Sequence, residues 1–477
     1  MDQIKKNKTE VLIKQLADIL KSEVDKAISE GKLTPKEQLF YRTEIDGFEY
    51  TDEGPKIGRQ SNQHIVKQDW LSSSFGTILQ SIKELDIFRS LIDNLISDPA
   101  IEKTSKIKMH GDLINFTNEL VECFLPNSDF NDDDVNDLLS IFIKKIYSEP
   151  LSFVTEIKLT NIIVLTSNLE FTVPGIENIS LRRITSKDLE VEFPASRFLF
   201  GDVEPYVNRS IGSYGLPSAI LEIKTTARKP DELVKDIKQS VTILRLFGTA
   251  DIDIMSHKIF TDPHVRHSSF GSLSSTLTGI DRYLKAFGNY RVTEDNAKKL
   301  IQFWKELSPK LSEKLFHGYE LKKNHLAITY ERYSDALLLP FEPRISNAVM
   351  GLEALLLDGH GELSFRLRTL ASKLLGSIGY DPIEIRQTVK KAYDIRSTYV
   401  HGGYLEEKDK NKLIRDYSSL NGFSKRILDI LRVILISMLM VDSTKRDFIE
   451  LANSSLISSE KDEELSNILK STKSILE

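Results

Sequence analysis

Four segments after Pro340 repeat apolar residues at the spacing of an α-helix, and this repetition limits the possible folds more than any other feature. In the first segment, for example, Ile345, Val349 and Leu352 fall on one stripe. The four segments are residues 342–358, 363–376, 381–403 and about 410–440. Amphipathic helices joined by short connections pack together, so we expect residues 341–477 to form an antiparallel helical bundle.

The whole chain has 477 residues, which is too long for a single hydrophobic core, so we expect more than one domain. Residues 153–165 are β-branched and partly alternating, which is typical of strands, and residues 230–248 predict a helix that begins at a proline and ends at a glycine. We therefore predict an α+β multidomain protein that is mostly helical. Its predicted parts are a helical N-terminal region (1–149), a mixed α/β domain (150–290), a connecting helical segment (291–340) and the helical bundle (341–477).

Composition excludes several classes of protein. The formal net charge is −6, so a nucleic-acid partner would need a local basic surface. Cys123 is the only cysteine, which excludes an intramolecular disulfide and fits a reducing compartment. The most apolar stretch, residues 426–441, contains Asp429 and Arg432, so we interpret it as a buried helix. We expect a cytoplasmic protein without a membrane partner.

The stretch DIRSTYVHGGYL, residues 394–405, places two reactive side chains where the third helix should end. Gly402 and Gly403 predict that end, because glycine readily adopts the left-handed conformation that terminates helices. His401 directly precedes the glycines. Arg396 falls on the apolar stripe of the helix, which runs through Ile385, Val389, Ala392 and Tyr399. A guanidinium on an apolar stripe needs a carboxylate, a cleft or a partner molecule.

An arginine beside a histidine suits the cleavage of RNA without metal. Arginine binds phosphate through two hydrogen bonds and stabilises charge that develops at phosphorus. Histidine transfers protons near neutral pH. Because the reaction needs both a base and an acid, two chains related by a two-fold axis would supply both histidines.

These residues resemble the HEPN superfamily of helical bundles, whose ribonuclease members carry an arginine and a histidine at this spacing. Residues 341–477 are similar to the ApeA-like branch in the segments PFEPRISNAVMGLEALLL, FRLRTLASKLLG and IRSTYVHGG. The resemblance implies a homodimer or higher even oligomer, a composite active site without metal or cofactor, and RNA cleavage in bacterial anti-phage defence by abortive infection. Arg396 would bind the scissile phosphate, His401 would be the acid/base group and Ser397 would support them.

Two interpretations of this segment stay open. In the first interpretation, both residues are structural: Arg396 pairs with a carboxylate such as Glu353, and His401 caps the helix. In the second interpretation, both residues act on RNA. Ser397 stands where active relatives often have Asn, Asp or His, so a non-catalytic RNA-binding or dimerisation module is an alternative. The remaining predicted RNA ligands are Arg366, Arg368, Lys373 and Tyr404. A tRNA loop is one candidate substrate, and a phage-derived trigger sensed by the first two regions is a hypothesis.

A second group of residues predicts a different nuclease. Asp202 precedes Glu222 by twenty residues, and Lys224 follows Glu222 on the same face of a predicted strand. This order resembles the PD-(D/E)xK nucleases, in which two carboxylates hold Mg²⁺ and the lysine orients water. The alternative interpretation of Glu222 and Lys224 is the solvated face of a strand. Dependence on divalent metal distinguishes this site from the first.

Overall fold

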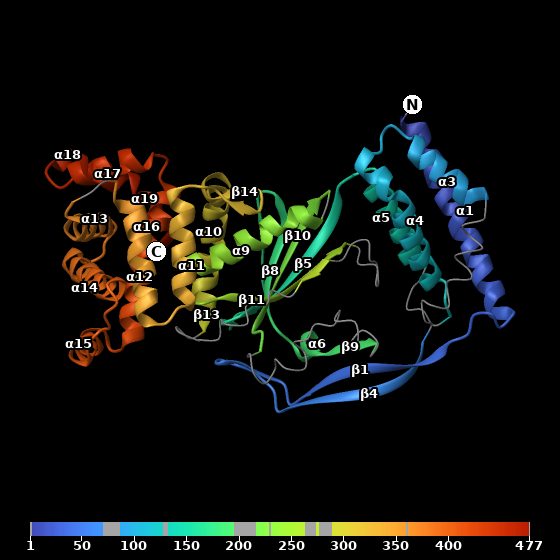
Figure 1. Ribbon diagram of the computed structural model, residues 1–477, viewed down its shortest axis with the longest axis horizontal. Helices are drawn as coiled ribbons and strands as arrows, with labels where there is room; N and C mark the ends of the chain where they lie inside the picture. The colour runs from blue at the N-terminus through green and yellow to red at the C-terminus, as the bar shows by residue number, and fades with distance from the viewer. Residues whose placement is uncertain are drawn as a thin grey trace.

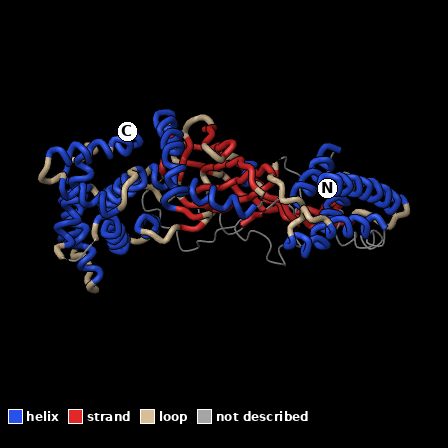
Figure 2. The backbone as a smooth tube through the Cα atoms, turned by 90° about the horizontal axis from the view of Figure 1, so that it is seen from above, coloured by secondary structure: helices blue, strands red, loops and turns tan. Residues whose placement is uncertain are grey.

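The computed structural model describes residues 2–69, 86–126, 132–194, 216–228, 230–262, 273–275, 289–358 and 361–476. Figure 1 shows helices at the N-terminal end, a β-sheet in the middle and helices at the C-terminal end of one long axis. The view from above shows the same order (Figure 2). The chain is therefore an α+β protein with a sheet-containing middle region between two helical ends, as the sequence predicted at this coarse level.

Among the described residues, four helices form the N-terminal end. Buried Ile13, Leu16 and Leu20 lie at helical spacing on the first of them. Phe116 and Phe142 stack between the last two, with ring centroids 3.8 Å apart. The helices are α1 (Asp2–Ser29), α3 (Asp86–Ser97), α4 (Lys103–Cys123) and α5 (Asp132–Ile146).

The region 1–149, which was predicted as helical, also contains strands that the sequence did not indicate. Strands β1 (Lys36–Asp46) and β4 (Arg59–Asp69) pair as an antiparallel ribbon below the sheet in Figure 1. A shorter pair, β2 (Glu49–Thr51) and β3 (Gly54–Lys56), lies within their connection. The other edge of β1 pairs with β9 (Val191–Pro194) from the middle region. Because β9 is far from β1 in sequence, no local pattern of residues indicates that these two strands pair.

The middle region is built on a six-stranded antiparallel sheet. In its strand β5 (Leu151–Thr160), Phe153, Ile157 and Leu159 are buried, and buried positions alternate with half-buried ones along the strand, which is the predicted period of two. The strands predicted in this region are present. In spatial order they are β12 (Leu273–Ser275), β11 (Asp253–Thr261), β5 (Leu151–Thr160), β10 (Ala219–Ala227), β8 (Ile176–Arg183) and β7 (Leu169–Val173).

Short elements complete the middle region and lead to the C-terminal helices. Strand β6 (Ile162–Val164) pairs in parallel with β13 (Tyr290–Val292), and the single turn α6 (Ser186–Leu189) precedes β9. The predicted helix of residues 230–248 is present as η2 (Pro230–Leu233) and α9 (Val234–Phe247). Trp304 of α10 (Glu294–Lys310) packs edge-to-face on Phe171 of β7.

The segment 291–340, which was predicted as a connecting helical segment, contains two α-helices with a short hairpin between them. Helix α10 continues into one π-helical turn, η3 (Leu311–Leu315). A minimal hairpin of β14 (Phe316–His317) and β15 (Glu320–Leu321) follows, and α11 (His325–Leu338) comes after it. Gly318, with φ of +59°, allows the tight reversal between the two strands.

The C-terminal part contains the expected amphipathic helices, but the predicted fourth helix is two helices. Ser418 has φ of +66°, which breaks the helix, and the Ser419 hydroxyl then accepts a hydrogen bond from Gly422 N–H at 2.8 Å. The helices are α12 (Phe341–Leu356), α13 (Leu363–Ser377), α14 (Pro382–Val400), α15 (Glu407–Tyr417), α16 (Leu420–Met440), α17 (Lys445–Ser454), α18 (Ser459–Ile468) and α19 (Lys470–Leu476).

Helix α16 is the buried helix that the apolar stretch predicted. It packs against α11, α12, α13 and α14. In the ranges that the structure describes, no helix has the combination of length and apolar character needed to cross a bilayer.

Arg432 joins α16 to the middle region. Its side chain is only 8% exposed. The guanidinium donates to the Leu246 and Phe247 carbonyl oxygens at 2.8 and 3.3 Å, at the end of α9, and pairs with Asp429 at 2.6 Å. Helix-end carbonyls lack intrahelical partners and carry negative partial charge. A buried cation therefore both donates hydrogen bonds to them and is attracted by their charge.

We therefore expect Arg432→Leu to lower the free energy of unfolding by about 3 kcal/mol, because Asp429 and the buried carbonyls would lose their donor. Urea unfolding followed by Trp304 fluorescence, in a Trp70→Phe background, measures this at the junction. Arg446→Leu, on the exposed face of α17, is the matched control and should change stability by no more than about 0.5 kcal/mol. Equal urea midpoints for the two variants would contradict this role of Arg432.

Candidate active site

Helix α14 ends where the sequence placed its end. The Gly402 N–H donates to the Tyr399 carbonyl at 3.0 Å, and the Gly403 N–H donates to the Thr398 carbonyl at 2.9 Å. Gly402 is left-handed, with φ of +81°. A Cβ on Gly403 would lie 2.9 Å from the Thr398 methyl carbon, so both glycines are needed. This paired arrangement is the Schellman motif, and it makes His401 the C-cap residue.

Arg396 lies in the last turns of α14, beside the buried stripe. That stripe continues from Ala392 to Ile395, whereas Tyr399, predicted on the stripe, is exposed. The Arg396 side chain is 26% exposed, and its guanidinium lies 5.8 Å from the centre of the Tyr393 ring. The guanidinium therefore reaches the surface from a half-buried position.

The carboxylate partner of Arg396 is Glu353 of α12, as one of the two interpretations predicted. The distance from Nη2 to the carboxylate is 3.4 Å, which is long for a charge-assisted hydrogen bond. The Arg396 Nε and the Glu353 Oε1 are both buried and have no hydrogen-bond partner among the described residues. The pair therefore leaves polar atoms of both residues unsatisfied, which a purely structural ion pair would avoid.

The electrostatics of Glu353 follow from this position. Burial raises the pKa of its carboxyl above the ordinary value, and the charge of Arg396 opposes that shift only in part. Arg396 is thus held near a carboxyl that burial biases toward its neutral form. The long contact and the unsatisfied Nε leave the Arg396 guanidinium with a donor for another anion.

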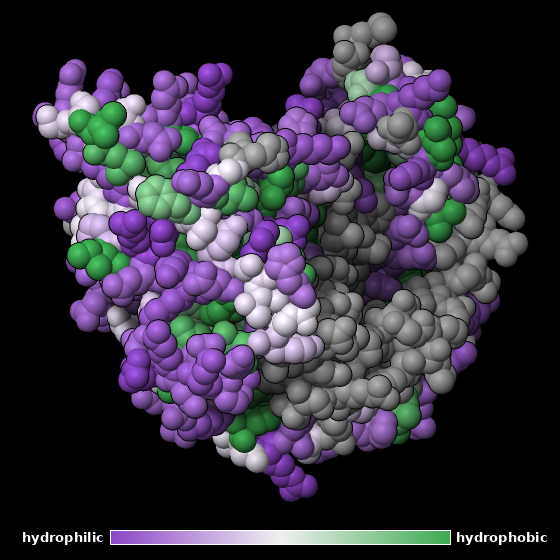
Figure 3. All heavy atoms as spheres, turned by 60° about the vertical axis from the view of Figure 1, so that its left-hand side comes forward, coloured by the Kyte–Doolittle hydropathy of each residue, from purple (hydrophilic) through white to green (hydrophobic). Residues whose placement is uncertain are grey.

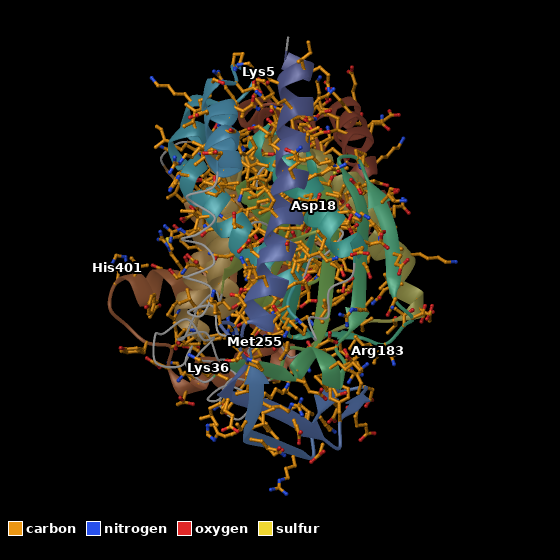
Figure 4. The ribbon with its side chains drawn as sticks, turned by 90° about the vertical axis from the view of Figure 1, so that its right-hand side faces the viewer. Lys5, Asp18, Lys36, Arg183, Met255 and His401 are labelled. Atoms are coloured by element: carbon orange, nitrogen blue, oxygen red, sulfur yellow. The ribbon has the colours of Figure 1, made fainter. Side chains whose placement is uncertain are left out.

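His401 is exposed on a turn at the outer edge of the molecule, as the label in Figure 4 shows. Its backbone N–H donates to the Ser397 carbonyl at 3.2 Å. No hydrogen bond links the side chains of Arg396 and His401 in the described part of the chain. Val400 and Tyr404 are exposed on either side of the histidine, and Tyr404 is 80% exposed. The single chain therefore presents the two residues separately.

The predicted RNA ligands of α13 differ in what they contact. Arg366 pairs with Asp358 at 2.6 Å, and Lys373 pairs with Asp462 at 2.7 Å. Arg368 instead lies 5.4 Å from the centre of the exposed Phe365 ring. Carboxylates thus neutralise two of the three cations, whereas Arg368 keeps its charge at an aromatic surface.

Sequence reasoning missed Arg386 of α14. Its guanidinium lies 5.8 Å from the centre of the same Phe365 ring, so Phe365 collects two cations from two helices. Exposed aromatic rings and arginine planes are the groups on which unpaired bases stack. The contact joins residues on different helices, so no local spacing signals it.

The alternative metal site is not assembled in the described residues. Glu222 and Lys224 do share one face of β10, as predicted. However, Arg182 donates to Glu222 at 3.1 Å, and Lys224 pairs with Asp262. Asp202 lies outside the described residues. Within the described ranges no cluster of three or more histidine, cysteine or carboxylate side chains is placed to hold a metal ion.

The raised pKa of Glu353 predicts a pH dependence of stability. The folded protein holds this proton more tightly than the unfolded chain, so the contribution of Glu353 is most favourable below its ordinary pKa of 4.5 and is lost as the pH rises through the folded value. Relative to Glu353→Gln, which stays neutral, the wild-type free energy of unfolding should fall between about pH 4 and 7. Urea unfolding of both proteins across this range tests the expectation, and a constant difference would contradict it.

Comparisons with models of protein families, with curated proteins and with solved structures find no match to this chain. No family is therefore assigned to it by overall similarity. The resemblance of residues 341–477 to HEPN bundles stays a prediction, and the function has to be argued from the end of α14 and its surroundings.

Proposed function

We propose that the protein is a metal-independent endoribonuclease of the HEPN kind, with Arg396 and His401 as its catalytic residues. The observation that carries the proposal is the incompletely satisfied Arg396, which lies five residues before an exposed histidine at the glycine-terminated end of α14. Phosphodiester cleavage needs a cation with unused donors and a group that transfers protons, and a second copy of the chain is proposed to bring the two together.

The proposed reaction is attack within the RNA itself. One histidine removes the proton of a 2′-hydroxyl, the oxygen forms a bond to the adjacent phosphorus, and the bond to the 5′-oxygen breaks. A second histidine gives its proton to the departing oxygen, which leaves as a hydroxyl, and a 2′,3′-cyclic phosphate remains. Arg396 hydrogen-bonds the non-bridging oxygens as their negative charge grows. Ser397 supports the pair from the adjacent position.

The second histidine is proposed to come from a second copy of the chain. Figure 3 shows the side that carries the C-terminal helices as mainly hydrophilic, with hydrophobic residues in small separate groups. Tyr399, Val400 and Tyr404 are exposed around His401. A two-fold contact through these side chains would bring both histidines together and complete the site.

The substrate and the biological role follow from the same proposal. Single-stranded RNA is the substrate class, with a tRNA loop as one candidate, because its bases are free to stack on Phe365, Arg368 and Tyr404. A role in anti-phage defence by abortive infection, with a phage-derived trigger, requires that the N-terminal and middle regions restrain the nuclease until infection.

Cleavage of total cellular RNA in EDTA tests the site directly. We expect His401→Ala to slow cleavage by about 10²–10⁴-fold, because a positioned acid/base group would be lost. Arg396→Lys keeps a charge beside Glu353 but loses two-point phosphate binding, so its rate should also fall. His317→Ala, an exposed histidine of β14, is the matched control and should cleave normally. Cleavage only with Mg²⁺ would contradict the proposal and favour Glu222 and Lys224.

The dimer is tested separately from the chemistry. Val400→Asp places a charge in the proposed contact, and we expect it to convert a dimer into a monomer of 54.3 kDa with loss of activity. Sedimentation velocity measures the mass. Ile457→Asp, at an exposed apolar position in the turn before α18, should leave the dimer intact. A wild-type protein that is monomeric while it cleaves RNA would contradict the composite site.

A further inference from the structure

A cavity of about 430 Å³ lies where the middle region meets the C-terminal helices. Its walls come from three separate elements: the turn after α9, the first residue of β13 and the first turns of α16. This volume falls in the range of pockets that hold small organic ligands. The cavity is distinct from the end of α14, because neither Arg396 nor His401 lines it.

The inner wall has the features of a binding surface. Thr249 is only 7% exposed, and its hydroxyl has no hydrogen-bond partner that meets normal geometry among the described residues. The Tyr333 hydroxyl lies near it but donates to the Arg245 carbonyl at 2.9 Å. The Tyr333 oxygen can still accept from Thr249, so a ligand that enters the cavity would compete with Tyr333 for this buried hydroxyl.

The aromatic wall is the ring of Tyr290. It packs edge-to-face against Phe247 with ring centroids 5.7 Å apart, so its orientation is fixed. Gly248 is necessary for this placement, because a Cβ there would lie 2.2 Å from a carbon of the Tyr290 ring. The chain therefore uses a glycine to bring a tyrosine ring to the cavity, where it offers an edge or a face to a planar group.

The charges at the cavity favour an anion. Lys425 is exposed and forms no ion pair with any described residue. Arg426 also lines the cavity and binds Glu384, while Asp429 pairs with the buried Arg432. Each carboxylate at this place thus already has a guanidinium partner, and Lys425 adds one uncompensated positive charge at the N-terminal end of α16.

We propose that this cavity binds a small organic phosphate of mononucleotide size. Its phosphate would lie against Lys425 and Arg426, its planar ring against Tyr290, and Thr249 would hydrogen-bond one of its polar groups. This inference does not depend on RNA cleavage. It adds a ligand at the junction that connects the middle region to α14, because Glu384 in the first turn of α14 is the carboxylate partner of Arg426.

Titration calorimetry of the full chain with AMP, GMP, CMP and UMP tests the proposal. We expect at least one of them to bind with a Kd below about 1 mM. The corresponding nucleoside, which lacks the phosphate, should bind at least about tenfold more weakly, because it loses the charge-assisted contacts. Absence of heat from all four mononucleotides at millimolar concentration would overturn the proposal, as would equal affinity for the nucleoside.

Variants locate the binding. Lys425→Glu alters only an exposed side chain and should weaken binding at least about tenfold, while Lys412→Glu on the exposed face of α15 is the matched control and should bind normally. Thr249→Val keeps the shape of the wall and should weaken binding several-fold. Arg396→Lys should bind like wild type. If Arg396→Lys abolished binding and Lys425→Glu did not, the mononucleotide would occupy the proposed nuclease site, and the cavity proposal would be wrong.

Discussion

The buried guanidinium of Arg432 is the contact on which the arrangement of the molecule depends. It comes from the most buried helix of the C-terminal part and ends on the last carbonyls of a helix that belongs to the middle region. Apolar side chains fill the same junction, but they slide at little cost in energy. A planar guanidinium with three fixed acceptors cannot slide in this way. Arg432 therefore determines the position of the C-terminal helices relative to the middle region.

The end of α14 shows a different use of charge. At Arg432 the hydrogen bonds are short and the partners numerous. Among the described residues Arg396 has one acidic partner, the long contact to Glu353, and buried atoms of both side chains stay unsatisfied. Proteins tolerate such incomplete pairing mainly where a ligand completes it. The contrast between two arginines of one domain, one saturated and one not, supports a role for the second outside stability.

The parts that sequence predicted well are those with local causes. The strands of the middle region follow from β-branched alternation, and the end of α14 follows from two glycines. The ribbon of β1 and β4 was missed because polar and charged residues occupy most of both strands, and the pairing of β1 with β9 is remote in sequence. The break at Ser418 was missed because a serine, not a glycine, takes the left-handed conformation there. Around the candidate site, spacing singled out Arg396 and His401 as candidates, but which carboxylates pair with Arg366 and Lys373 depends on how helices pack.

The pairing of β1 with β9 has a consequence for how the protein is made. Val191 leaves the ribosome about 145 residues after Asp46. At about 5–20 residues per second, the nascent ribbon waits on the order of 10–30 s with one strand edge open. Charge on an open strand edge discourages pairing with other chains. The charged residues of β1, which include Lys36, Glu37, Arg42 and Glu44, therefore protect its edge during this interval. The ribbon is therefore protected during synthesis by the polar character that concealed it in the sequence.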